Sequence, residues 1–196
     1  MRIENYGPYR TTEQIFSHFR SLMSKRGGIE EILLGESVQG RPLLAWAAGG
    51  SVGSPTAMYL SGCHAIELIG AEQCCAVADS ILGEKRGLLD KVRVYFFPVM
   101  NPDGYEKVIR LARRHLIPLV KTNARRVDLN RNFPVGFYEP HEGGIMSGSH
   151  RKTINYHGPS PLSEPESQAL VKLVDIARPT ISLALHSFGG SIRIPP

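Results

Sequence analysis

Short apolar runs alternate with helical patterns along this 196-residue chain, and this alternation limits the fold more than any other feature. Strands are expected at 29–34, 42–47, 56–62, 92–99 and 181–186, and helices at 11–26, 66–82 and 163–177. Strands alternating with helices indicate an α/β fold with an open, mixed, mostly parallel twisted sheet and helices on both faces. No repeat or linker interrupts the chain, so we expect a single domain over residues 1–196.

Local signals refine three of these boundaries. The run Asn101-Pro102-Asp103-Gly104 predicts a turn after the strand at 92–99. Ser163 is expected as the N-cap of the last helix, with Glu166 completing a capping box. Residues 134–163 are rich in Gly, Pro and His and lack periodicity, which is typical of a long functional or disordered loop.

The net charge of +5 is unevenly distributed. Between Lys107 and Arg131 there are eight basic residues against one acid, Asp128, so this segment favours an anionic partner. The alternative is a solvated helix face, to which Arg110 and Arg114 are assigned. No aromatic residue interrupts the segment to stack on bases, so we do not expect a nucleic-acid partner.

Location is predicted from the absence of targeting patterns. The first residues contain no apolar stretch of the secretory type, and no apolar run reaches the length of a membrane span. Three cysteines are too few for a disulfide framework. We therefore expect a cytoplasmic protein without a membrane partner, whose oligomeric state the sequence leaves open.

Three potential metal ligands stand at the ends of two predicted strands. His64 and Glu67 are three residues apart just after the strand at 56–62, and His186 ends the strand at 181–186. The carboxyl ends of neighbouring strands meet at one edge of such a sheet. Two imidazoles and one carboxylate would form a three-ligand zinc site with an open fourth position. A strand-end histidine is more often a hydrogen-bonding residue, so spacing alone leaves both interpretations open.

Six motifs together resemble the zinc carboxypeptidase (funnelin) family. They are Gly35-Glu36-Ser37 with Gly40-Arg41, His64-Ala65-Ile66-Glu67, Asn101-Pro102-Asp103-Gly104, Val127-Asp128-Leu129-Asn130-Arg131-Asn132-Phe133, Ser163-Glu164-Pro165-Glu166 and His186-Ser187-Phe188. They occur in the order of the family and cover nearly the whole chain. The pair Asn123-Ala124 and the small size most resemble the bacterial branch that includes murein-peptide amidases.

The resemblance implies a role for each matching residue. His64, Glu67 and His186 would bind Zn²⁺, and Asn130 and Arg131 would hold the C-terminal carboxylate of a peptide substrate. A guanidinium fork suits that task because it matches a carboxylate in bidentate fashion. The implied activity is a zinc-dependent metallocarboxypeptidase that hydrolyses a C-terminal peptide or amide bond with metal-activated water.

The chain departs from the family pattern where an arginine usually polarises the scissile carbonyl. Counting back from Val127 gives Lys121, and Arg125 is the other candidate for stabilising the oxyanion. Arg126 stands where the family prefers glycine, so we expect a different local turn.

The family's general base, a glutamate, lies well beyond the third metal ligand. Only ten residues follow His186, and none of them is Glu, Asp or Tyr. The expected base is therefore not in the chain, which we interpret as truncated at its C-terminal side. Two alternatives remain: a non-catalytic pseudoenzyme that binds peptide carboxylates, and a zinc amidohydrolase acting on N-acyl amino acids, as in the succinylglutamate desuccinylases.

Overall fold

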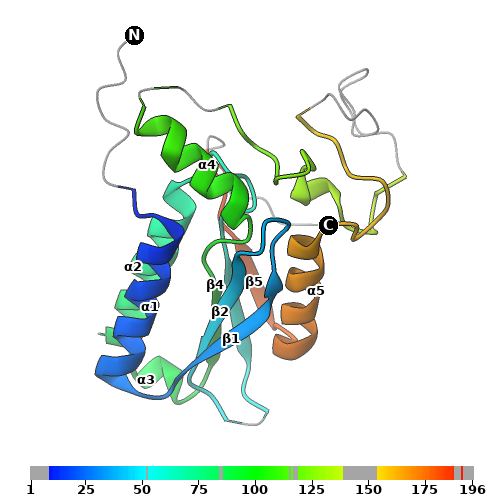
Figure 1. Ribbon diagram of the computed structural model, residues 1–196. Coiled ribbons are helices and arrows are strands. Elements are labelled where there is room, and N and C mark those ends of the chain that lie inside the picture. Colours follow the sequence, from blue (N-terminus) through cyan, green and yellow to red (C-terminus); the bar gives the residue numbers. More distant parts are fainter. Residues whose placement is uncertain are drawn as a thin grey trace.

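A five-stranded mixed sheet forms the centre of the molecule, with strand order β1-β2-β4-β3-β5 (Figure 1). The computed structural model describes residues 9–51, 53–83, 86–114, 116, 119–138, 154–187 and 191. The strands are β1 (Ile29–Glu36), β2 (Pro42–Ala48), β3 (Thr56–Leu60), β4 (Arg93–Phe97) and β5 (Ile181–Ala184). β2 pairs antiparallel with β1 and β4, whereas β3 pairs parallel with β4 and β5.

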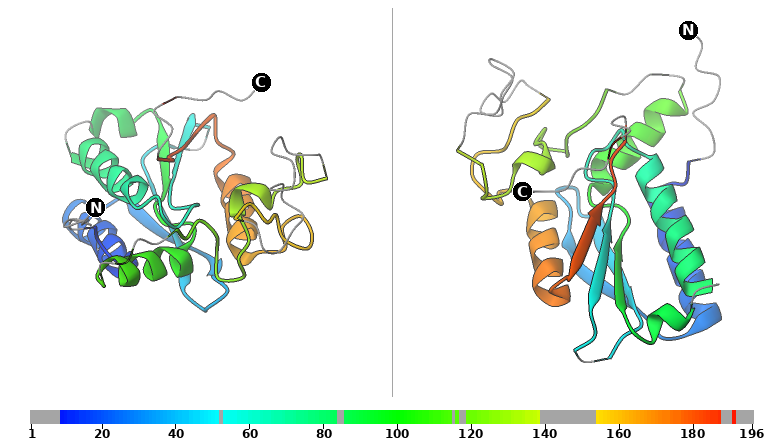
Figure 2. Two further views of the ribbon diagram at one scale, coloured as in Figure 1. Left: turned by 90° about the horizontal axis from the view of Figure 1, so that it is seen from above. Right: turned by 180° about the vertical axis from the view of Figure 1, so that it is seen from behind.

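Helices cover both faces of this sheet (Figures 1 and 2). They are α1 (Thr12–Arg26), α2 (Ile69–Gly83), α3 (Arg86–Leu89), α4 (Pro102–Ala112) and α5 (Pro165–Ala177), with one short 3₁₀ turn, η1 (Leu129–Arg131). α1 and α2 lie against one face and α5 lies against the other. The predicted α/β class, mixed sheet and layering are therefore confirmed, although two of the four described strand pairs are antiparallel, so the sheet is not mostly parallel. Within the part of the chain that is described, no helix is long and apolar enough to cross a membrane.

β2 explains why this sheet needs helices on both sides. Its residues from Leu43 to Ala48 are all buried, so alternate side chains face two different cores. Trp46 faces α1, where its ring stacks on Phe19 with centroids 4.6 Å apart. Leu43 belongs to the opposite core, which includes Leu173 of α5.

β5 is an edge strand of the described sheet. Its four residues are all exposed, including Ile181 at 57% and Leu183 at 41%. Apolar side chains at an unpaired strand edge are a site for association with another strand.

Two local predictions were wrong. The expected turn at 101–104 is the start of α4, because the Asn101 side chain accepts a hydrogen bond from the Gly104 N–H at 3.0 Å and Pro102 occupies the first turn. The expected capping box at α5 is absent because Glu164, not Ser163, is the N-cap, and its side chain does not cap the helix. The carboxylate of Glu166 instead accepts the Val38 N–H at 3.2 Å.

The expected loop at 134–163 is described only at 134–138 and 154–163, where it contains no helix or strand. Residues 139–153 lie outside the described part, so the order of that portion stays a prediction.

Candidate metal centre

The three predicted ligands come from the ends of two adjacent parallel strands. Leu60 is the last residue of β3 and pairs with Ala184, the last residue of β5. His64 and His186 follow these strand ends on the same edge of the sheet. The parallel pairing of β3 with β5 thus explains how residues far apart in sequence meet.

A tight turn carries the first two ligands. The Glu67 N–H donates to the His64 carbonyl at 3.1 Å, and the Gly70 N–H donates to the Glu67 carbonyl at 3.2 Å. As a result α2 begins at Ile69 rather than at 66, where we expected it. The turn brings both side chains together before the helix starts.

The donor atoms converge as a metal site requires. The two oxygens of Glu67 lie 2.9 Å from Nδ1 of His64 and 2.9 Å from Nδ1 of His186. One donor atom from each residue lies within 4.8 Å of the others, and the imidazole centroids are 4.7 Å apart. His64 and Glu67 are buried whereas His186 is exposed, so the group is open on one side. Two imidazole nitrogens and a carboxylate fit Zn²⁺ with a free position.

Charges are strongly coupled in this group. Burial opposes ionisation of Glu67, but its hydrogen bonds to His186 and His64 prevail and lower the pKa of its carboxyl to about 2. Burial likewise lowers the pKa of His64, but hydrogen bonds to Asp128 and Glu67 outweigh it, so the net shift is upward. Without metal, the site therefore favours a carboxylate beside a protonated imidazole.

Asp128 holds the far side of the His64 ring. Its Oδ1 lies 3.2 Å from Nε2 of His64, and its Oδ2 accepts from the Lys121 ammonium at 2.6 Å. Lys121 also donates to Asn155 at 3.0 Å. Asp128 is fully buried. Burial raises the pKa of its carboxyl, but the hydrogen bonds to His64 and Lys121 lower that pKa by more, so the net shift is downward. This arrangement leaves Nδ1 of His64 directed at the other ligands.

Asn130 and Arg131, which are predicted to bind the carboxylate of a substrate, lie just after Asp128 in the chain. Asn130 follows Asp128 in η1, and its N–H donates to Oδ1 of Asp128 at 3.1 Å. Arg131 donates to the Asn130 carbonyl at 3.1 Å. Burial raises the pKa of the Cys63 thiol, and the nearby charges of Lys121 and Arg131 partly oppose the rise. Arg131 thus lies within electrostatic range of the residue that precedes His64.

The two oxyanion candidates are placed differently. Lys121 reaches the metal group through Asp128. The guanidinium of Arg125 instead lies 3.4 Å from the Ser163 carbonyl and 3.8 Å from Glu164. Of the two, only Lys121 contacts a residue that touches a candidate ligand.

Two residues that support the site had no structural role assigned to them from the sequence. Asn155, in the expected loop, is a partner of Lys121. Asn123 donates to Glu164 at 2.7 Å and to Glu166 at 3.1 Å, and its Oδ1 accepts the Val127 N–H at 3.0 Å. These buried bonds tie the segment before Asp128 to the start of α5. Only its place in a family-like motif singled out Asn123, and nothing singled out Asn155.

A mixed α/β sheet whose strand ends carry a His/Glu/His donor group is an arrangement found in zinc hydrolases. The sequence profile of the zinc carboxypeptidase family matches residues 16–196, so the chain belongs to that family.

Relatives and solved structures agree with this assignment. The chain is 28% identical to carboxypeptidase A2 of Mus musculus over 97% of its length, and 30% identical to carboxypeptidase A5 of Macaca fascicularis over 97%. It covers 47% and 45% of these two proteins, so it spans about half the length of the curated relatives it matches.

The structural matches show the same fold. Carboxypeptidase A from Helicoverpa armigera superimposes with a TM-score of 0.77 at 24% identity, covering 92% of this chain and 46% of that one. Murein-tripeptide amidase MpaA from Escherichia coli O157 has a TM-score of 0.56 at 24% identity, covering 84% and 64%. The expected likeness to the murein-amidase branch is therefore present in the fold.

Proposed function

We propose that the chain contributes the metal-binding part of a zinc-dependent metallocarboxypeptidase that hydrolyses the C-terminal peptide or amide bond of a peptide. The convergence of His64, Glu67 and His186 carries this proposal. Bound there, Zn²⁺ would act as a Lewis acid and lower the pKa of a water molecule toward about 7.

The chain's own residues would bind and orient the substrate. Arg131 and Asn130 would hold the terminal carboxylate, the first by a charged bidentate pair and the second as a neutral donor. That contact would fix the last peptide bond beside the metal ligands. Family membership supports this proposal, because zinc carboxypeptidases act on peptides at the C-terminal residue.

Lys121 is the better candidate for the oxyanion. Its ammonium contacts Asp128 beside the metal group, whereas Arg125 is engaged with Ser163 and Glu164. In this proposal Lys121 supplies positive charge near the scissile carbonyl and does not offer the planar fork of an arginine.

Four carboxylates among the described residues are already engaged and are poor candidates for the general base. Glu72 accepts the Arg10 N–H at 2.8 Å, Glu164 is bound by Asn123, and Glu67 and Asp128 belong to the metal group. In this proposal the base belongs to a part of the whole protein that this chain does not include, because the chain spans about half the length of the curated relatives it matches. We also propose a cytoplasmic location, to be checked by fractionating cells that express the tagged full reading frame.

The test combines metal content with turnover. Zinc measured after dialysis should be about one per chain in the wild type and should fall in His186→Ala. His18→Ala is the matched control, because His18 pairs with Asp79 at 3.1 Å between α1 and α2 and lies outside the donor group found among the described residues. The full reading frame should release single C-terminal amino acids from a peptide panel that also contains N-acyl amino acids. Zinc retained by His186→Ala would refute the metal site.

A second candidate is a pseudoenzyme that binds peptide carboxylates without hydrolysing them. It would use the same His64, Glu67 and His186 group and the same carboxylate-binding residues, without a general base. A reading frame that stops at Pro196 and binds zinc and peptide without turnover would select it. Preferential cleavage of N-acyl amino acids in the panel would instead select an amidohydrolase.

A further inference from the structure

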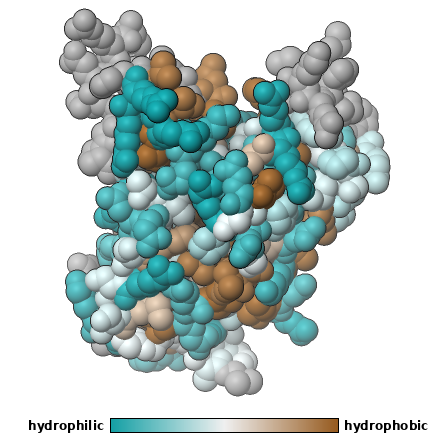
Figure 3. All heavy atoms as spheres, in the orientation of Figure 1, coloured by the Kyte–Doolittle hydropathy of each residue, from teal (hydrophilic) through white to brown (hydrophobic). Residues whose placement is uncertain are grey.

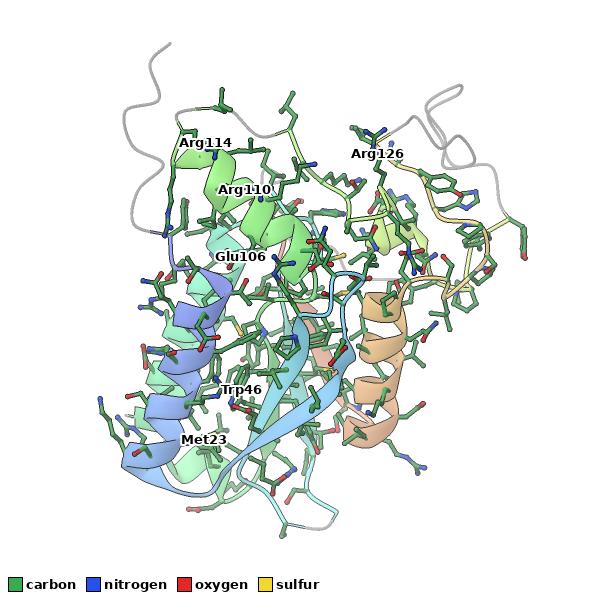
Figure 4. All side chains as sticks on the ribbon, in the orientation of Figure 1. Met23, Trp46, Glu106, Arg110, Arg114 and Arg126 are labelled. Carbon is green, nitrogen blue, oxygen red and sulfur yellow. The ribbon has the colours of Figure 1, made fainter. Side chains whose placement is uncertain are left out.

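A pocket lies between α4 and the loop at 120–126. Its volume is about 260 Å³, and no candidate metal ligand lines it. Figure 4 labels Arg110 on α4 and Arg126 on the loop across from it. Figure 3 shows hydrophilic residues gathered over both elements on this face. The pocket is therefore a polar feature that the proposed peptidase chemistry does not use.

Cations outnumber acids in the lining. The cationic residues are Arg41, Lys107, Arg110 and Arg126, and the acidic ones are Asp103 and Glu106. Three of these four cations belong to the basic segment 107–131, so the pocket gathers part of that segment's charge at one place.

Both acids are already occupied by protein partners. Asp103 is buried, and its oxygens accept from the Ser37 hydroxyl at 2.9 Å, from the Gln39 N–H at 2.9 Å and from Arg41. Glu106 accepts the Thr12 N–H at 2.6 Å, at the start of α1. Asp103 is thus paired with Arg41, whereas Glu106 keeps its negative charge, so the lining carries a net charge of +2 from four cations and two acids.

Three cations remain without a counterion. Among the described residues, none forms an ion pair or side-chain hydrogen bond with Lys107, Arg110 or Arg126. Lys107 and Arg110 are three residues apart on α4 and so lie on one helix face. Arg126 approaches from the facing loop. All three side chains are exposed, so water screens their mutual repulsion, and an anion between the two elements would gain charged contacts from both.

The backbone of Arg126 provides an independent indication. Its φ is +66°, in the left-handed region that a non-glycine residue rarely adopts. A bulky residue held in that conformation is strained, and such strain gathers at binding sites. Arg126 therefore combines a strained backbone with a charged side chain in the lining of the pocket.

We propose that this pocket binds a compact, phosphate-bearing anion between α4 and the loop at 120–126. Two guanidinium groups and an ammonium on two sides suit a tetrahedral dianion, which can accept charged hydrogen bonds from several directions. The volume admits a phosphoryl group with a small substituent, and none of the lining residues is aromatic, which excludes a base-stacking site. The inference does not depend on the metal centre.

The experiment is calorimetric titration at low ionic strength with inorganic phosphate and with phosphoserine, which separate a free from an organic phosphate. Citrate is the carboxylate comparison. The expected result is one phosphate site per chain, weakened about tenfold or more in Arg110→Gln and in Arg126→Gly. Arg114→Gln is the matched control, because it removes the same charge from the same basic segment but lies outside the pocket lining. It should bind as the wild type does.

Several results would overturn the proposal. They are no binding of either phosphate, equal affinity for citrate, or equal loss in Arg114→Gln. Phosphate binding that disappears in His64→Ala would assign it to the metal centre and would equally reject the pocket. Since His64→Ala should retain phosphate while losing zinc, failure of this proposal is distinguishable from failure of the peptidase proposal.

Discussion

Replacing Asp128 by asparagine tests how the metal ligands are held. The substitution keeps the size of the side chain but removes the charge that pairs with Lys121 at 2.6 Å and faces Nε2 of His64 at 3.2 Å. The amide can also present its NH₂ to the imidazole, so the ring loses its fixed orientation. Loss of such a supporting partner typically weakens metal binding about 10- to 100-fold, which is about 1.4 to 2.7 kcal/mol.

The folded chain should also lose stability. Asp128 is fully buried, whereas the Lys121 side chain is 23% exposed and can recover some hydration. We therefore expect a decrease in the free energy of unfolding of about 1 to 3 kcal/mol, in the range for a buried polar partner left unsatisfied.

Asp103→Asn is the matched control for both measurements. Asp103 is also a buried carboxylate paired with a cation, Arg41, but it contacts no candidate metal ligand. Zinc affinity is measured by competition with a chromophoric chelator, and stability by urea denaturation of the metal-free chain. Asp103→Asn should lose stability and keep zinc affinity. Equal zinc affinity in Asp128→Asn and Asp103→Asn would refute the role of Asp128.

Three further predictions concern the charges and the backbone. In the metal-free chain, the raised pKa of His64 means a stabilising contribution that is complete below its usual 6.5 and lost as the pH rises through the raised value. The carboxyl of Glu67, with its pKa lowered to about 2, contributes above its usual 4.5 and loses that contribution toward pH 2. Urea denaturation with chelator should therefore show a maximum between these limits, and an equal alkaline slope in His64→Gln would contradict the assignment. Gly104→Ala should destabilise the chain by about 1–3 kcal/mol and weaken zinc binding. Its Cβ would lie 2.7 Å from Cβ of Ala65, between the first two ligands, whereas Gly87→Ala has open space and should be neutral; equal effects would refute this. Arg126→Gly should raise the free energy of unfolding by up to about 1 kcal/mol, because glycine adopts a φ of +66° without strain, and a decrease measured by thermal denaturation would contradict it.

The layered fold was predictable because its signals are local. Buried strands such as β2 read as continuous apolar runs, and α1 has a capping box at Thr11 with apolar residues at helical spacing. The order of the strands was not predictable, since it depends on which edges pair in space. The start of α4 was mistaken for a turn because Asn and Pro favour both a turn and a helix N-terminus.

For the candidate site, too, some parts could be predicted from the sequence and others could not. The strand ends suggested His64, Glu67 and His186 as possible ligands, and the resemblance to the zinc carboxypeptidase family assigned them to one metal; their donor atoms do converge. The partner of Lys121 in the loop, Asn155, has no sequence signal, because its contact depends on how that loop returns over the sheet. Likewise, the sequence showed a basic segment but not that Arg110 and Arg126 face one pocket.

The most direct test is a crystal structure of the zinc-loaded chain with anomalous scattering measured at the zinc edge. We predict one peak, bonded to Nδ1 of His64, Nδ1 of His186 and the carboxylate of Glu67 at about 2.0 to 2.2 Å, with a further position open to water. A zinc ion bound by other residues, or these three side chains without zinc at saturating metal, would contradict the account.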